Sequence, residues 1–335
     1  MTHLLKPLQA GSLTLHNRLI MPPMATARSE ADGSISQALL DYYQEKSDGG
    51  YFSLIIIEHS FISPEGKASN QQLSVADDRA VEGLRSLAEV IHHNGSKTIM
   101  QINHAGSATT QEITGTIPVA PSAVPNPRNG NTPKELSKQE IDGIAQAFQN
   151  AARRVKAAGF DGVEIHSAHG YLLNQFFSAL TNQRNDEYGG TIHHRIRLHL
   201  QVIEAVRAAV GNDFPVFLRL GACDYKAGGI TIEDSQIAAR EFEKAGINVL
   251  DISGSFMGYN SPESSVQGYF APLTEAIKQV VSIPVVLTGG ITEPQAAEQL
   301  LEEGKTDLIG VGRAVLKNSQ WAKQAIETLR NTNLQ

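Results

Sequence analysis

The chain of 335 residues contains a single cysteine, Cys223. One thiol cannot form an intrachain disulfide, a cysteine-based zinc site or an iron-sulfur cluster, because each of these needs several sulfur atoms. Such cysteine usage is typical of a reducing compartment. The sequence therefore predicts a cytoplasmic protein without disulfides and without a metal site built from cysteines.

Long apolar runs and blocks of like charge are also missing. No apolar stretch approaches the roughly 20 residues of a membrane helix, and residues 1–7 lack the basic and apolar regions of a signal peptide. Lys and Arg number 28 and Asp and Glu number 35, which gives a net charge of -7 spread along the chain. We therefore expect a soluble protein that binds neither nucleic acid nor membranes.

The composition indicates a globular protein, with 41% apolar and 19% charged residues. Length alone allows one large domain or two medium ones, since barrels of about 250 residues often form one unit. No linker or low-complexity segment divides the chain. The sequence predicts one domain over residues 1–335.

Short, apolar and often β-branched segments recur along the whole chain, as expected for buried parallel strands. The eight predicted strands are 18–21, 54–58, 97–102, 162–165, 216–220, 249–252, 285–288 and 308–311. Helical patterns lie between them, including one at about 138–158 that follows a capping box at Ser137 and Glu140. Helix starts are also predicted at Thr231 and Thr292.

Eight strand-helix units predict an α/β fold closed into a (β/α)₈ TIM barrel. Residues 8–15, with Gly11 and Ser12 at the turn, predict a hairpin that covers the N-terminal end of the barrel. An open doubly wound sheet is the alternative, although the chain has no G-x-G-x-x-G turn. Two long connections, 103–136 and 167–192, follow strands and are expected to be functional.

Residues that directly follow the strands are the candidates for catalysis and binding, because barrel active sites lie at the C-terminal ends of the strands. His166, His169 and Tyr171 form the densest polar cluster. They suit a metal site, a pair of hydrogen-bond donors or a proton-transfer group, or they are loop residues without a role. The absence of an H-E-x-x-H helix disfavours zinc.

Other strands carry polar residues at similar positions. Gln101 and His104 follow one strand, and Glu58 and His59 end another. Arg219 lies in an apolar strand, where its guanidinium needs either an anionic ligand or a structural carboxylate partner.

The last two predicted strands end in glycines, at Gly289-Gly290 and at Gly312, which Arg313 follows. Glycines let backbone N–H groups approach a phosphate, and arginine adds a fixed positive charge. Tight turns also need glycine. At the seventh and eighth strands of a barrel, however, the combination predicts a phosphate-bearing ligand.

Five segments together resemble the Old Yellow Enzyme family, most closely its short bacterial, thermophilic-like branch. They are Asn17-Arg18-Leu19-Ile20-Met21-Pro22-Pro23-Met24, Gln101-Ile102-Asn103-His104-Ala105-Gly106, Ala120-Pro121-Ser122, residues 159–172, and Asn182-Gln183-Arg184-Asn185-Asp186-Glu187-Tyr188-Gly189-Gly190. The resemblance covers nearly the whole chain. It implies a TIM barrel that binds FMN at the C-terminal ends of its strands and takes NADPH or NADH as reductant.

The resemblance also implies a role for each matching residue. His166 and His169 would hydrogen-bond the substrate oxygen, and Tyr171 would supply the proton. The expected cofactor-binding residues are Pro23, Met24, Ala25 and His59 around the ring, Gln101 and Arg219 at its pyrimidine edge, and Gly289, Gly290, Gly312 and Arg313 at the phosphate. The implied reaction is ping-pong: FMN passes hydride from NAD(P)H to an activated alkene, which Tyr171 protonates.

Two departures from the family pattern concern the first strand. Ala25 occupies the position usually taken by a flavin-tuning Cys or Thr, and Ala27 the place where the short branch often has a substrate-contacting tyrosine. Thr26 would take the place of the usual flavin-tuning Cys or Thr only if the loop shifts. The redox potential and the substrate range are therefore left open.

Several alternatives remain open from the sequence. A larger branch of the family adds an iron-sulfur cluster and a C-terminal nucleotide-binding region, and we expect neither here, given the single cysteine and the end of the chain soon after the last predicted helix. The competing functions are an NADH oxidase that uses oxygen, a metal-dependent TIM-barrel hydrolase and a non-enzymatic flavin carrier. The physiological acceptor, the choice of NADH or NADPH and the oligomeric state are not fixed.

Overall fold

Eight parallel strands form a closed barrel in chain order in the computed structural model, which describes residues 2–256 and 258–332. The strands are β3 (Leu19–Met21), β4 (Leu54–Phe61), β5 (Lys97–Asn103), β8 (Gly162–Ser167), β9 (Val216–Gly221), β10 (Val249–Ser253), β11 (Val285–Thr288) and β12 (Leu308–Gly310), and β12 pairs with β3. All eight predicted strands are thereby confirmed, and the (β/α)₈ prediction with them. The open doubly wound sheet is excluded because the last strand pairs with the first.

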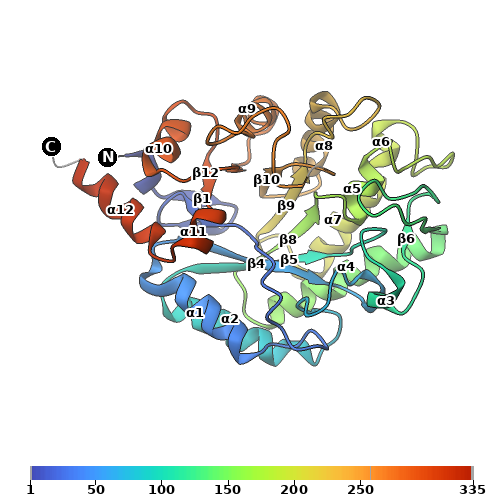
Figure 1. Cartoon of the computed structure of the whole chain (residues 1–335), viewed down its shortest axis with the longest axis horizontal. Helices are drawn as coiled ribbons and strands as arrows, with labels where there is room; N and C mark the ends of the chain where they lie inside the picture. The colour runs from blue at the N-terminus through green and yellow to red at the C-terminus, as the bar shows by residue number, and fades with distance from the viewer. Residues whose placement is uncertain (1, 257, 333–335) are drawn as a thin grey trace.

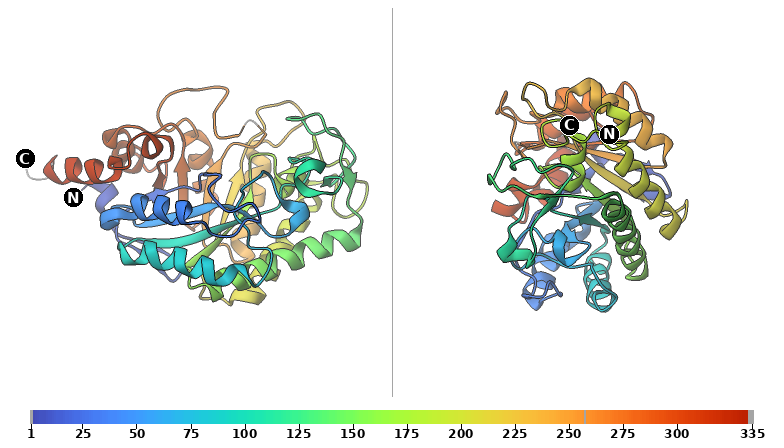
Figure 2. Two further views of the ribbon diagram at one scale, coloured as in Figure 1. Left: turned by 60° about the horizontal axis from the view of Figure 1, so that its bottom comes forward. Right: turned by 90° about the vertical axis from the view of Figure 1, so that its right-hand side faces the viewer.

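Helices surround the barrel on its outside (Figures 1 and 2). The longer ones are α1 (Gln37–Ser47), α2 (Ala80–His93), α4 (Lys138–Ala157), α7 (Arg197–Val210), α8 (Ile232–Lys244), α9 (Ala271–Lys278), α10 (Pro294–Glu302) and α12 (Trp321–Thr332). In the part of the chain that the structure describes, none is long and apolar enough to cross a membrane.

Side-chain caps fix the start of two predicted helices. Ser137 and Glu140 form the predicted capping box before α4, and the Thr231 side chain accepts a hydrogen bond from the backbone of Asp234. The helix start predicted at Thr292 has no such cap. Helix α10 begins at Pro294 without a side-chain cap, because the Gln267 side chain binds the free backbone N–H groups before it.

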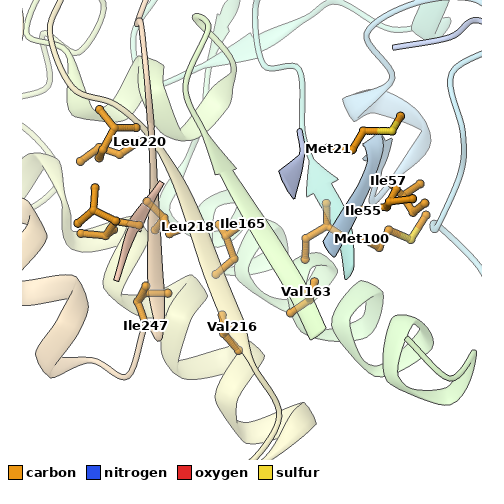
Figure 3. Packing of buried hydrophobic residues seen from close by; sticks show 14 of the residues in the cluster. Met21, Ile55, Ile57, Met100, Val163, Ile165, Val216, Leu218, Leu220 and Ile247 are labelled. Carbon is orange, nitrogen blue, oxygen red and sulfur yellow. The ribbon is translucent and has the colours of Figure 1, made fainter. Parts of the chain in front are cut away.

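The larger apolar core lies between the barrel and the helices. Figure 3 shows part of it, with Met21, Ile55, Met100, Ile165 and Leu218 coming from five successive strands. Side chains alternate between the two faces of a strand, so the residues between these point into the barrel. Each strand is therefore apolar on both faces along most of its length, which explains the continuous hydrophobic runs in the sequence.

The N-terminal hairpin closes the end of the barrel at which the strands begin, as predicted. Strands β1 (Leu8–Ala10) and β2 (Leu13–Leu15) pair in antiparallel fashion around the turn at Gly11. Their buried side chains form one apolar cluster with inward residues of the barrel strands, among them Leu54 and Phe217. The interior is therefore filled and sealed at this end, so a ligand would enter the barrel from its C-terminal end.

The two long connections contain more regular structure than expected. The segment after β5 includes α3 (Gln111–Thr114) and a small parallel sheet of β6 (Val119–Ala120) and β7 (Lys134–Glu135). The segment after β8 includes α5 (Leu172–Phe177) and leads to α6 (Ile192–Arg195). Both cover the C-terminal side of the barrel.

Replacing Leu15 by alanine should lower the free energy of unfolding by about 2–5 kcal/mol, since the fully buried leucine fills the N-terminal end of the barrel. Denaturant unfolding followed by circular dichroism would measure this loss. The control is Thr14→Ala on the exposed side of the same strand, which should change stability by less than about 0.5 kcal/mol. Equal effects of the two substitutions would contradict the role of the hairpin as a lid.

Candidate active site

A layer of buried polar side chains lies above the apolar interior of the barrel. Gln101, Glu164, Arg219 and Asp251 come from the neighbouring strands β5, β8, β9 and β10, and all are at most 3% exposed. The register pairs Gln101 with Glu164 and Arg219 with Asp251. Paired residues of parallel strands share a face of the sheet, so these four side chains meet inside the barrel.

Hydrogen bonding in this layer is incomplete. The Gln101 amide donates to Glu164 Oε2 at 2.6 Å, whereas Glu164 Oε1 and both Asp251 carboxylate oxygens lack partners among the described residues. Arg219 Nε lies 3.3 Å from Asp251 Oδ2 but without hydrogen-bond geometry. Arg219 thus has the structural carboxylate partner that its sequence position suggested. Its terminal guanidinium nitrogens nevertheless make no hydrogen bond to any residue that the structure describes.

The two buried carboxyl groups are shifted toward their neutral forms. Burial and the nearby Asp251 raise the pKa of Glu164 to about 8, against the opposing effect of Arg219. Burial raises the pKa of Asp251 to about 6, again opposed by Arg219. At pH 7 the Glu164 carboxyl is therefore protonated and the layer is close to electrically neutral.

Three imidazoles and one phenol gather directly above this layer. The ring of His166 lies 5.0 Å from that of His169 and 5.1 Å from that of Tyr171. The His59 ring lies 5.3 Å from Tyr171 and 6.3 Å from His166. The predicted cluster on β8 is thus assembled as expected, and strand β4 adds His59 to it.

Hydrogen bonds to backbone and amide donors set the tautomers of two of these rings. The backbone N–H of Ala168 donates to His166 Nδ1 at 3.3 Å, and the Gln72 amide donates to His59 Nδ1 at 2.7 Å. A nitrogen that accepts a hydrogen bond carries no proton, so both rings bear their proton on Nε2. Neither Nε2 has a protein partner among the described residues, and each is free to donate.

Burial keeps the whole cluster uncharged. It lowers the pKa of His59 to about 4, with a further contribution from Arg219. It also holds the pKa of His166 and of His169 well below the usual value of 6.5, with repulsion from neighbouring imidazoles and Arg219 in support. The pKa of the Tyr171 phenol is raised by burial, although Arg128 opposes the shift. Near neutral pH the cluster therefore presents neutral N–H and O–H donors.

His169 sits at a strained point of the backbone. Its φ of 58° lies in the left-handed region, which is uncommon for residues other than glycine. The ring contacts Ser253 through an Nε2–Oγ distance of 2.8 Å, and Arg128 donates to the His169 carbonyl at 2.9 Å. These contacts from β10 and from the segment after β5 hold His169 in place.

The Tyr171 hydroxyl has no hydrogen-bond partner in the described part of the chain. The backbone of Tyr171 is fixed, because its N–H donates to the Ala168 carbonyl and its own carbonyl accepts from Gln175. The phenol is thus held at the start of α5 with a free O–H group next to His166 and His59. Such a group is suited to donate a proton to a bound molecule.

Glycines and one arginine line the rim above β11 and β12. A side chain at Gly289 or Gly290 would meet the Tyr269 ring, with a Cβ at Gly290 coming within 2.6 Å of it. Arg313 is exposed and donates to Tyr269 Oη at 2.8 Å and to Asn260 Oδ1 at 3.1 Å. Both acceptors are neutral, so an anion that replaced them would bind the guanidinium more strongly.

The segment after β3 forms the remaining side of the rim. Pro23 and Met24 are partly buried and Ala25 is exposed. The Thr26 N–H donates to Glu58 Oε2 at 3.2 Å, while its hydroxyl accepts from the backbone of Arg28. The Thr26 hydroxyl is therefore engaged, as an acceptor, with the backbone of its own loop.

Not every polar residue that follows a strand joins this cluster. His104 is buried and its Nδ1 accepts from the Gly106 N–H, but no contact joins it to the imidazole cluster. Over residues 2–256 and 258–332, no three His, Cys, Asp or Glu side chains are arranged to hold a metal ion. The metal-dependent hydrolase thus has no donor set in that part of the chain.

Two contributors to the site were not identified from the sequence. Asp251 interrupts an apolar strand just as Arg219 does, and this shared signal could have paired them. Gln72 comes from a polar loop after β4, and nothing in the local sequence marks it. Its role depends on a contact that only the folded chain creates.

Comparison with known proteins agrees with this architecture. Residues 3–333 match the model of the NADH:flavin oxidoreductase / NADH oxidase family. An NADH oxidase of Thermoanaerobacter brockii is 44% identical over 96% of this chain, which spans about half the length of that relative. An NADPH dehydrogenase of Geobacillus sp. is 36% identical, with 99% of this chain and 96% of the relative covered.

Solved structures of the same type superpose on nearly the whole chain. A morphinone reductase in complex with tetrahydroNAD has a TM-score of 0.84 at 29% identity and covers 97% of this chain and 90% of its own. The Old Yellow Enzyme homologue of Zymomonas mobilis has a TM-score of 0.84 at 28% identity, with 97% and 92% covered. The chain therefore belongs to the NADH:flavin oxidoreductase / NADH oxidase family, the Old Yellow Enzyme family that its sequence motifs resemble.

Proposed function

We propose that the chain is an FMN-dependent NAD(P)H oxidoreductase that reduces activated alkenes such as enones, enals and nitroalkenes. Residues 1–335 would act as one FMN-binding domain. The observation that carries the proposal is the free phenol of Tyr171 beside the neutral His166 and His169, above the free guanidinium of Arg219. This arrangement offers a proton and hydrogen bonds to an uncharged, polarised substrate.

The polar groups left without partners fit an isoalloxazine ring. Arg219 has free terminal nitrogens that suit a ring carbonyl and the negative charge of the reduced form. Gln101 donates to Glu164 with its amide nitrogen, which leaves its oxygen to accept from a ring N–H. Pro23, Met24, Ala25 and His59 would lie along the ring.

The opposite side of the rim fits a phosphate. Gly289, Gly290 and Gly312 have no Cβ, so a phosphate that displaced the Tyr269 ring packed on the first two could approach their backbone N–H groups, and Arg313 would provide the positive charge. A phosphate there would replace the neutral Tyr269 and Asn260 as partners of Arg313. These assignments support FMN over a flavin without phosphate.

When bound, FMN would supply a hydride that it has received from NADPH or NADH. The residues of this chain then act on the alkene. The Nε2–H of His166, together with His169, would donate to the carbonyl or nitro oxygen and withdraw electrons from the double bond. Tyr171 would deliver its proton to the α-carbon.

Oxygen as the main acceptor is a second candidate, supported by the name of the Thermoanaerobacter brockii relative, an NADH oxidase. Anaerobic titration of the purified protein with NADH and with NADPH, followed by absorbance, tests both proposals. If NAD(P)H is consumed faster under nitrogen with an enone than in air without one, the result supports the alkene reductase. Turnover in air that an enone does not change supports the oxidase, and protein that takes up no added FMN excludes both.

Replacing Tyr171 by phenylalanine should slow alkene reduction by about 10²–10⁴-fold, because the substitution removes the proton donor and keeps the ring. Reduction of the flavin by NAD(P)H should change less than about threefold, since that step needs no proton from Tyr171. Stopped-flow absorbance separates the two half-reactions. Equal losses in both would show that Tyr171 has another role.

Replacing Arg313 by alanine should weaken FMN binding by about 10–100-fold, as expected for the loss of a charge-assisted hydrogen bond to phosphate. The fluorescence of FMN titrated with the apoprotein gives the dissociation constant. The control is Lys317→Ala, which removes an exposed positive charge at the other end of the same short helix, α11 (Arg313–Lys317). Equal affinity of the two variants would contradict the phosphate assignment.

A further inference from the structure

Gln72 is a buried glutamine whose amide is fully engaged. Its Nε2 donates to His59 Nδ1 at 2.7 Å and to the His59 carbonyl at 3.0 Å. Its Oε1 accepts from the backbone N–H of Ala68 at 2.6 Å. The Ala68 N–H can only donate, so the amide oxygen must face it and the amide nitrogen must face His59.

The loop that carries Gln72 is tied to the strand that carries His59. Phe61, two residues after His59, donates to the Leu73 carbonyl at 3.0 Å and accepts from Val75 at 3.0 Å. Gln72 itself is only 3% exposed. The glutamine is therefore positioned by the same backbone pairing that continues β4, and it has no other side-chain partner among the described residues.

The contact determines which His59 nitrogen holds the proton. Since the Gln72 amide donates to Nδ1, the proton lies on Nε2, on the other side of the ring. The groups that face this ring are Tyr171 and His166, both neutral, and the positively charged Arg219. None of them provides a carboxylate that would favour the charged or the opposite form.

We propose that Gln72 is a positioning residue that holds His59 as the Nε2–H tautomer, so that His59 stabilises Tyr171 after the phenol has given up its proton. The inference rests on the proposed alkene reduction. In that step the Tyr171 O–H bond breaks and a C–H bond forms at the α-carbon. The phenolate accepts a hydrogen bond from His59 Nε2–H and is later reprotonated by water, while His59 keeps its own proton.

Gln72→Glu is the informative substitution because it keeps the size of the side chain and reverses its hydrogen-bonding role. A carboxylate can only accept, so it would draw the proton of His59 to Nδ1 and leave Nε2 as an acceptor. The matched control is Gln71→Glu, which adds the same charge at the neighbouring, exposed position. Gln72→Met, which cannot hydrogen-bond in this way, distinguishes loss of the contact from its reversal.

Nitrogen NMR of the apoprotein with labelled histidine tests the tautomer directly, with His59→Asn identifying the signal. We expect the proton on Nε2 in the unmodified protein and in Gln71→Glu, and on Nδ1 in Gln72→Glu. A mixture is expected in Gln72→Met. A proton on Nδ1 in the unmodified protein, or no change in Gln72→Glu, would overturn the proposal whatever reaction the protein catalyses.

A second readout concerns Tyr171 and needs no substrate. Ultraviolet titration of the apoprotein, with Tyr171→Phe subtracted, gives the ionisation of this phenol. Gln72→Glu should make the phenol harder to ionise, because His59 would then accept from the phenol and no longer donate to the phenolate. An unchanged titration would show that His59 does not act on Tyr171.

The half-reactions complete the test. Gln72→Glu should slow alkene reduction by about 10–100-fold, the effect of losing one hydrogen bond to a charged group, and should slow it more than it slows flavin reduction, which needs no phenolate. In the Tyr171→Phe background the same substitution should have little further effect, since both act on one step. If the losses from Gln72→Glu and Tyr171→Phe add in the double variant, His59 acts on the flavin and not on Tyr171, which contradicts the proposal. Protein that reduces no alkene would reject the proposed function, while the NMR result still decides the role of Gln72.

Discussion

Closure of eight parallel strands is the constraint on which the site depends. A closed barrel of this size has room inside only for side chains, and all eight strands end at the same rim. The hairpin at the other end completes the apolar filling. Polar residues that would be unfavourable within a strand, such as Arg219 and Asp251, are therefore tolerated only in the layer next to the open rim.

That layer gives the rim a particular electrostatic character. It places the positive charge of Arg219 next to the Asp251 carboxylate, beneath a group of imidazoles that burial keeps neutral. Neutral N–H and O–H donors can stabilise negative charge that develops on a ligand without first attracting anions strongly. Contacts to Ser253 and Arg128 hold one of these donors, His169, in its left-handed backbone conformation.

Much of this could be predicted from the sequence, for reasons visible in single residues. Residues 54–57 are apolar on both faces because the strand is buried on both, and His166 and Tyr171 were found because they lie at or just after the end of such an apolar stretch. Gln72 could not be found, because its partner His59 is reached through a loop without periodicity. The start of α10 was misplaced at Thr292 because Gln267, distant in sequence, binds the helix end that a local cap would have served.

The buried titratable groups also make the stability of the fold depend on pH in two opposing ways. Histidines with lowered pKa (His59, His104, His166, His169 and His199) take up protons on unfolding below about pH 6.5, so they reduce stability as the pH falls from there. Carboxyl groups with raised pKa (Glu58, Glu164 and Asp251) release protons on unfolding, and they reduce stability as the pH rises from about 4 toward 8. The two sets compensate each other between about pH 4 and 6.5. Between about pH 6.5 and 8 the effect of the carboxyl groups is no longer offset by the histidines, so Glu164, which helps to shape the site, also makes the barrel less stable in mildly alkaline solution.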